Sequence, residues 1–262
     1  EKLDGHTVKL RFMHGQSYGY NAYFEGDTVA FVRASTMERF ASACVVSVKR
    51  LTDRTVEVAF DRDIPKELEL NHDCVENISC TPEVEIRNCY FTRTSTRGTL
   101  MTTPRKVIIA NNTYYKTGMS AILIEGDAEG WYESGPVKDV LIQNNIFIDC
   151  AYNGGPEYAV IALNPSNTII DAAHPVHRNV RIIGNTFQTF GNPVLYAKST
   201  EGLVFKDNKV TSTPLPGGAL QKPVFILNGS KNVTIKDNIL KGTFRENIVF
   251  RNMKKGFIKT DL

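Results

Sequence analysis

The chain has 262 residues, of which 31 are basic and 28 acidic, and its formal net charge is +3. An apolar fraction of 42% is typical of a folded globular protein and argues against a disordered chain. The basic residues form neither a run nor a stripe interleaved with aromatics, so nucleic-acid binding is disfavoured. The longest apolar runs are strand-sized and far shorter than the roughly 18 residues of a membrane-spanning helix, so we expect no membrane span.

The first residue is Glu1, and no signal segment opens the sequence, so we expect a mature or excised portion of a longer protein. Five cysteines without CxxC spacing argue against a zinc site and against a dense disulfide framework. One bridge between Cys74 and Cys80 stays open as an alternative. Buried thiols are expected for Cys89 and Cys150.

Residues 1–78 predict a small antiparallel β-barrel or β-sandwich domain. Short segments with alternating apolar residues are separated by turn residues. These segments are 7–12, 28–33, 43–51 and 55–60. Residues 36–43 would also allow a helical turn. No cluster of histidines, cysteines or acids stands out here, so we expect this domain to have a structural role.

Residues 79–262 contain an internal repeat. Each copy has alternating aliphatic residues, then Asn, any residue, and an aromatic or aliphatic residue. A second strand-like run separates each copy from the next. Aligned on the Asn position, which one copy fills with cysteine, the repeats give the column Cys89, Asn112, Asn145, Asn185, Asn208 and Asn238.

This repeat predicts a right-handed parallel β-helix with an internal asparagine ladder. Asn tolerates the left-handed turn conformation, and its amide can bond to neighbouring backbone, so we expect the column residues to sit at the turns. Stacked coils would place Asn over Asn and bury the flanking apolar residues as one core. An antiparallel fold with Asn in hairpin turns is the alternative. The missing tight turns and the unequal intervals disfavour it.

The run AILIEGDAEGWYESG at 121–135 is the candidate site. If Ile122 and Ile124 point inward, then Leu123, Glu125 and Asp127 point outward, because side chains alternate along a strand. Glu125 and Asp127 would then lie about 7 Å apart on one face. Two neighbouring carboxyl groups can divide acid and base roles, because one pKa is raised by the other's charge. The alternative is a solvated strand end, where acids are common.

Longer intervals in the repeat predict loops that crowd one region of the surface. The inserted segments are 125–136, 151–158 and 166–177. They carry aromatic residues that can wall a sugar pocket and additional acids. These are Trp131, Tyr132, Tyr152 and Tyr158, with Glu133, Asp149 and Glu157. For Trp131 a core position is the alternative to a sugar platform.

Two more groups of residues are candidates for binding, one for the substrate and one for a metal ion. Arg97 and Thr103 flank the strand of the preceding coil and are expected to face the same cleft. For Arg97, a surface charge or a partner to Glu125 is the alternative. His174 and His177 have a spacing that would allow a metal site, but exposed loop histidines are the favoured interpretation.

Three runs carry a resemblance to a known family. They are NCYFTRTSTRGTLMTTPRKVIIANNTYY, GMSAILIEGDAEGWYESGPVKDVLIQNNIFIDC and AVIALNPS. Over about 84–171 the chain resembles glycoside hydrolase family 110, the exo-acting α-1,3-galactosidases. The resemblance implies a parallel β-helix with attached small β-barrel domains. It also implies hydrolysis of terminal α-1,3-linked galactose with inversion, and neither a metal nor an organic cofactor. Family members are much longer than this chain, so we expect it to be a C-terminal portion of such an enzyme.

An inverting mechanism needs a carboxylic acid and a carboxylate base about 6.5 to 9.5 Å apart. Asp127 is the first choice for one role, and Glu133 or Glu125 for the other, with Asp149 in reserve. The residues assigned to substrate binding are Arg97, Thr103, Trp131, Asp149 and Asn164. A non-catalytic glycan-binding or structural β-helix is the competing interpretation; a polysaccharide lyase is disfavoured because no lysine lies among the acids. We expect a bacterial secreted, periplasmic or cell-surface location, since the expected substrates are extracellular glycans.

Overall fold

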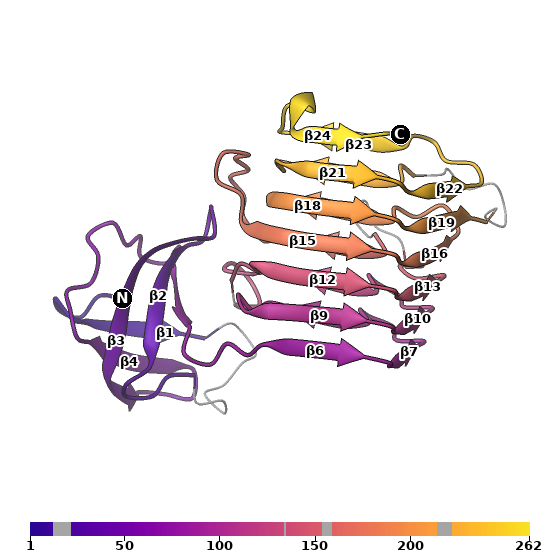
Figure 1. Ribbon diagram of the computed structural model, residues 1–262. Helices are drawn as coiled ribbons and strands as arrows, with labels where there is room; N and C mark the ends of the chain where they lie inside the picture. The colour runs from indigo at the N-terminus through magenta and orange to yellow at the C-terminus, as the bar shows by residue number, and fades with distance from the viewer. Residues whose placement is uncertain (13–21, 134, 154–158, 214–221) are drawn as a thin grey trace. The chain divides into compact units, whose positions relative to one another are not determined.

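The computed structural model describes residues 1–12, 22–133, 135–153, 159–213 and 222–262. In these residues the regular structure is almost entirely β-strand, with one short 3-10 helix and no α-helix. The chain divides into two compact units (Figure 1). The antiparallel unit comprises Glu1–Thr81, Gly126–Gly135 and Ser166–Ile169. The solenoid unit comprises Pro82–Glu125, Pro136–Pro165 and Ile170–Leu262.

The antiparallel unit is built on one sheet with the strand order β1-β4-β3-β2-β5. Its strands are β1 (Thr7–Arg11), β2 (Thr28–Arg33), β3 (Glu38–Arg50), β4 (Thr55–Phe60) and β5 (Cys74–Asn77). Alternate residues such as Val56, Val58 and Phe60 are buried together with Phe31 from β2. The predicted antiparallel architecture is therefore confirmed, and its core comes from the period-2 pattern seen in the sequence.

The helical turn that residues 36–43 would also allow does not form. Strand β3 begins at Glu38, and its first half pairs with β2 while its second half pairs with β4. The register shifts in both ladders, as expected for a long strand that bends between two partners. The preceding turn ends at Met37, which has a φ of 62°. Pairing with β2 and β4 determines the strand conformation of this segment, because its local sequence carries no helical periodicity that would favour a helix.

The solenoid unit is a parallel β-helix whose coils each contribute a strand to three sheets. Figure 1 shows the stacked strands of two of these sheets, which begin with β6 and β7. The β6 sheet contains β6 (Val84–Arg87), β9 (Lys106–Ala110), β12 (Asp139–Gln143), β15 (His177–Ile183), β18 (Thr200–Lys206), β21 (Val233–Lys236) and β24 (Ile258–Thr260). The β7 sheet contains β7 (Tyr90–Thr92), β10 (Thr113–Tyr115), β13 (Ile146–Ile148), β16 (Thr186–Thr189), β19 (Lys209–Ser212) and β22 (Ile239–Lys241). The β8 sheet contains β8 (Thr99–Met101), β11 (Ile122–Ile124), β14 (Ile161–Leu163), β17 (Leu195–Lys198), β20 (Phe225–Asn228) and β23 (Ile248–Arg251). The short helix η1 (Lys255–Phe257) precedes β24.

The predicted asparagine ladder runs through the turns between the β6 and β7 sheets. The Oδ1 atom of Asn145 accepts the backbone N–H of Asn112 at 2.9 Å and its side-chain N–H at 3.1 Å. The same pair of bonds joins Asn145 to Asn185, Asn185 to Asn208 and Asn208 to Asn238. The ladder begins at Cys89, whose N–H donates to Asn112.

The left-handed conformation belongs to the residue before each ladder position, which corrects the expectation for the ladder asparagines. Asn111 and Asn144 have φ values of 58° and 54°. Gly184 occupies the equivalent place with a φ of 68°. This residue turns the chain, and the next residue can then point its amide into the stack and stay buried.

The interior of the solenoid is a stack of identical positions from successive coils. In the β7 sheet, Phe91, Tyr114, Phe147 and Phe187 are consecutive register partners. Their rings stack with centroid separations of 4.7, 5.1 and 4.8 Å. Such stacking requires the parallel register, because only that register places the same position of each coil directly over the last.

All five cysteines are free thiols, so the Cys74–Cys80 bridge does not form. Cys150 is buried, as predicted. Cys89 is exposed, which contradicts the prediction. Cys89 starts the ladder at the first coil, where no described coil covers it from outside.

Candidate functional site

The run after β11 shows the predicted alternation. Ile122 and Ile124 are fully buried in the solenoid core. Leu123 belongs instead to a separate apolar cluster on the outer side of the β8 sheet, which includes Ala162 and Tyr196. Glu125 follows as the next outward position and is half-buried.

Glu125 and Asn164 lie side by side at the carboxyl end of the β8 sheet. Ile124 is the register partner of both Met101 and Leu163, so Glu125 and Asn164 follow on neighbouring coils. The backbone N–H of Asn164 donates to the carbonyl of Ile124 at 2.8 Å. Neighbouring strands lie about 4.8 Å apart, so the structure brings these two predicted residues together.

The other predicted residues of the solenoid unit lie elsewhere. Arg97 precedes β8 and Asp149 follows β13, so both lie in turns that lead into the β8 sheet at its amino end. Glu125 lies at the opposite, carboxyl end of this sheet. The length of a three-residue strand and its flanking residues therefore separates Arg97 and Asp149 from Glu125 by roughly 10 Å or more. Thr103 is buried, and its hydroxyl donates to the carbonyl of Pro82 at 2.7 Å. That bond gives Thr103 a role in fixing the turn after β8.

The inserted segments leave the coils at two different places. Segments 125–136 and 166–177 connect strands of the β8 sheet to strands of the β6 sheet, whereas residues 151–153, the described part of 151–158, follow a strand of the β7 sheet. Tyr152 is 46% exposed. The predicted wall residues Glu157 and Tyr158 lie outside the described residues.

The two histidines of the last insertion have different environments. His174 is exposed, and its Nδ1 lies 2.7 Å from the carboxylate of Asp171. His177 was expected in an exposed loop, but it begins β15 and is fully buried. Its Nδ1 accepts the backbone N–H of Val137 at 3.3 Å, and burial lowers its pKa to about 3. In the part of the chain that the structure describes, no group of three or more His, Cys, Asp or Glu side chains is arranged to hold a metal ion.

Asp127 organises the loop that follows β11. This loop, residues 126–135, belongs to the antiparallel unit. The Oδ1 atom of Asp127 accepts the N–H groups of Glu129 and Gly130 at 2.7 and 2.9 Å. Its Oδ2 atom accepts the N–H of Trp131 at 2.8 Å. The side chain is buried, and its backbone N–H donates to the carbonyl of Glu133 at 3.0 Å, so Asp127 closes the loop on itself.

Further contacts fix both ends of the 126–135 loop to the antiparallel unit. At the start, the N–H of Ala128 donates to the hydroxyl of Ser166 at 3.0 Å, and its carbonyl accepts the Cys74 thiol at 3.0 Å. At the end, the N–H of Gly135 donates to Glu76 at 2.9 Å.

Glu76 is itself held by Arg39. Both oxygens of Glu76 accept guanidinium N–H groups of Arg39 at 2.7 Å, and both side chains are largely buried. A Cβ atom at Gly135 would lie 3.1 Å from Glu76 and 3.2 Å from Arg39. The close approach of this ion pair therefore favours glycine at position 135.

The anchored loop presents two aromatic residues. Trp131 is 62% exposed, which excludes the core position that was the alternative for it. Tyr132 is 49% exposed and has a φ of 53°. A left-handed conformation costs a non-glycine residue about 1 to 2 kcal/mol, so the surrounding contacts must hold Tyr132 in it.

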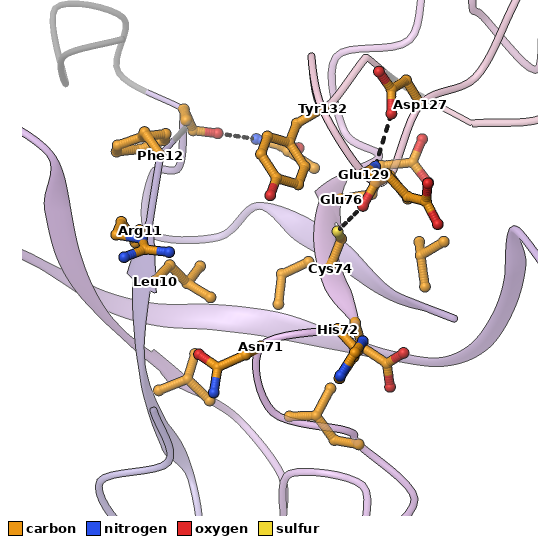
Figure 2. A pocket seen from close by; sticks show the side chains of 18 of the residues that line it. Leu10, Arg11, Phe12, Asn71, His72, Cys74, Glu76, Asp127, Glu129 and Tyr132 are labelled. Carbon is orange, nitrogen blue, oxygen red and sulfur yellow. Dashed lines mark hydrogen bonds between the residues drawn. The ribbon is translucent and has the colours of Figure 1, made fainter. Parts of the chain in front are cut away.

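A cavity of about 740 Å³ lies within the antiparallel unit beside this loop (Figure 2). Asp127 and Glu133 both line it, so the structure brings these two predicted residues to one cavity. Trp131 is not among its lining residues. The opposite side is formed by β1 and by the segment before β5, whose residues showed no local motif. Only the fold brings these segments to the loop, so sequence reasoning missed Arg11, Asn71 and His72.

Two family descriptions match the chain. Residues 77–260 match the family described as right handed beta helix region. Residues 7–75 match the family described as GLAA-B beta-barrel domain II.

The chain is also similar to named proteins. It is 69% identical to alpha-1,3-galactosidase A of Bacteroides fragilis over 264 residues, which is 100% of this chain and 44% of that protein. It is 36% identical to alpha-1,3-galactosidase B of Bacteroides thetaiotaomicron, over 99% of this chain and 42% of that protein. It is 35% identical to alpha-1,3-galactosidase B of Akkermansia muciniphila, over 91% of this chain and 30% of that protein. The chain thus spans less than half of the length of each of these relatives.

Proposed function

The chain belongs to the right-handed β-helix family, and from that premise we propose that it is part of a glycoside hydrolase that releases terminal α-1,3-linked galactose from glycans. The observation that carries the proposal is the 69% identity, over the whole chain, to a protein named alpha-1,3-galactosidase A. The β-barrel match at residues 7–75 agrees with the arrangement that the sequence resemblance implied.

The proposed chemistry is an inverting displacement shared by two carboxyl groups. The candidates are Asp127, Glu133 and Glu125. Both oxygens of Asp127 accept hydrogen bonds from the loop backbone, so its side chain is fixed in place as an acceptor. This supports Asp127 as the base or as a residue that positions the loop, and it leaves the acid role to Glu133 or Glu125.

A non-catalytic glycan-binding or structural role is the second candidate. Two observations favour this role. The chain spans only 44% of the length of alpha-1,3-galactosidase A of Bacteroides fragilis, and the Asp127 side chain is used to hold its own loop. In either case we propose a secreted, periplasmic or cell-surface location, because the proposed substrates are glycans outside the cell. In the described residues, no helix is long and apolar enough to cross a membrane.

The test is release of galactose from an α-1,3-linked galactosyl oligosaccharide, followed by NMR of the first anomer formed. Inversion predicts β-galactose. Removal of the general acid or base, by Glu133→Gln, Glu125→Gln or Asp127→Asn, should lower kcat by about a hundredfold or more. The exposed Glu25→Gln serves as the matched control and should keep full activity. If wild-type chain releases no galactose but binds the oligosaccharide, the non-catalytic candidate replaces the hydrolase.

A further inference from the structure

The cavity of the antiparallel unit has two walls that are held rigidly and carry polar side chains (Figure 2). One wall is the 126–135 loop, which is anchored by the ion pair of Arg39 and Glu76. The other contains the turn at 69–73. Arg33 holds this turn through Glu69 at 2.7 Å and through the carboxylate of Asp73, whose side chain is fully buried, at 2.9 Å.

The turn at 69–73 is also closed by its own hydrogen bonds. The N–H of Glu69 donates to the side chain of Asp73 at 2.8 Å, and the N–H of Asp73 donates to the carbonyl of Glu69 at 2.9 Å. The guanidinium of Arg33 stacks on the ring of Phe40 with its carbon 5.0 Å from the centroid. Both walls are therefore pre-organised, which reduces the entropy that a ligand must remove on binding.

The groups that face the opening are suited to a hydroxylated ligand. Tyr132 lies at one side of the opening. Arg11 from β1 and Asn71 and His72 from the turn line the cavity elsewhere (Figure 2). No ion pair in the described residues involves Arg11 or His72. Guanidinium, amide and imidazole groups can donate or accept bonds with hydroxyl groups, and the tyrosine ring offers an apolar face.

The charge of the lining favours a neutral ligand. Among the described residues, seven acids and three bases line the cavity, so an anionic ligand is disfavoured. Four of the acids are held in ion pairs, and Arg11 lines the same cavity as Glu129 and Glu133, so no strong field selects a cation. The volume of about 740 Å³ exceeds that of one monosaccharide and lies in the range of small-ligand sites. A short neutral oligosaccharide fits both the size and the mixture of aromatic and polar groups.

We propose that this cavity binds the sugar units that remain after the terminal galactose, with Tyr132 as the stacking residue and Arg11, Asn71 and His72 as hydrogen-bonding residues. The inference rests on the proposed function only for the identity of the glycan. Tyr132 keeps its left-handed backbone because the anchored loop holds it there, and this conformation directs its ring to the cavity. Arg39 and Glu76 are positioning residues for this site, since they act through the backbone of Gly135.

The test measures binding and hydrolysis separately on the whole chain. The probe for binding is the product oligosaccharide, which is the α-1,3-galactosyl substrate without its terminal galactose, titrated by calorimetry. Tyr132→Ala and Arg11→Ala should each weaken binding about tenfold, as expected for one well-packed ring or one charged hydrogen-bonding group. Phe24→Ala is the matched control, because Phe24 is an exposed aromatic of the same unit outside the cavity, and it should keep wild-type affinity.

The outcomes separate the two proposals. Product binding that depends on Tyr132 and Arg11 supports the cavity even if the chain releases no galactose. If both variants bind the product as tightly as the wild-type chain, the proposed binding site is wrong. It is also wrong if the wild-type chain releases galactose but does not bind the product. Neither result contradicts the proposed hydrolase. Circular dichroism of each variant verifies its fold. Tyr132→Asn removes the ring without added strain, because asparagine tolerates the left-handed backbone, and it should weaken binding as Tyr132→Ala does.

Discussion

The asparagine ladder and the 126–135 loop satisfy their buried polar groups in opposite ways. In the ladder each amide makes the same bonds to the next coil, so one residue type at one position repeats through the stack. In the loop every anchor is different, and its partners Cys74, Glu76 and Ser166 come from distant parts of the sequence. A repeated interaction is visible in the sequence as a period, whereas a set of unique interactions leaves no pattern.

The ladder should show the largest response to mutation. Asn145→Ala removes the acceptor of two N–H groups of Asn112 and the donor to the carbonyl of Ile109, all in a buried environment. Two to three buried groups without partners should lower the free energy of unfolding by about 3 to 5 kcal/mol. Urea denaturation followed by far-UV circular dichroism measures this. Asn238→Ala, at the half-buried end of the ladder, should cost only about 1 kcal/mol, and equal losses at both positions would contradict a cooperative buried ladder.

The ion pair that holds the loop should show the next largest response. Arg39→Ala leaves Glu76 largely buried without its bidentate partner, so we expect a loss of about 2 to 4 kcal/mol. Fluorescence of Trp131, which lies in the loop, reports the unfolding of this region. The double variant Arg39→Met with Glu76→Gln removes both charges and keeps an acceptor for Gly135, so most of the loss should be recovered. A double variant as unstable as Arg39→Ala would show that the charge itself is needed.

The fold was predictable because its signals are local or periodic. Alternation at residues 55–60 gave a buried face, and the Asn column gave the parallel register of the solenoid. The sequence left residues 36–43 open between a strand and a helical turn, because the pairing of β3 with two strands is a long-range effect. The exposure of Cys89 was missed for a related reason, since burial of a ladder position depends on a covering coil.

The candidate site was predictable only in part. The acids and aromatics of 121–135 were visible as a local cluster, and the structure places Asp127 and Glu133 on one cavity. The use of Asp127 as the acceptor of three backbone N–H groups was not visible, because an Asp in a polar loop can either cap a turn or act in chemistry. Arg11 and His72 were missed because the fold alone brings them to the loop.

His177 lies where the inserted segment 166–177 joins strand β15, and its burial predicts that the stability of the protein depends on pH. Burial holds its folded pKa at about 3, below the unfolded value of about 6.5, so the unfolded chain binds a proton that the folded chain does not. The contribution of His177 to the free energy of unfolding is therefore fully present above about pH 6.5 and is lost as the pH is lowered towards 3. The loss between pH 7 and pH 5 is about 2 kcal/mol.

Denaturation over this pH range measures the effect of His177. His177→Asn keeps an acceptor for the Val137 N–H and should remove most of this pH dependence. His174→Asn is the matched control, because His174 is exposed and should leave the pH dependence in place. A slope that survives His177→Asn would assign the effect to other groups.

Tyr132 should show the smallest change in stability and a clear change in binding. In Tyr132→Asn, relief of the left-handed strain offsets the lost contact of a half-exposed ring, so the free energy of unfolding should change by no more than about 1 kcal/mol. Tyr132→Val introduces a β-branched residue at the same φ and should be less stable than the asparagine variant by about 1 to 2 kcal/mol. Tryptophan fluorescence during urea denaturation measures both. Equal stability of the two variants would show that the loop relaxes rather than holding the strained backbone, and the ring would then have no fixed orientation towards the cavity.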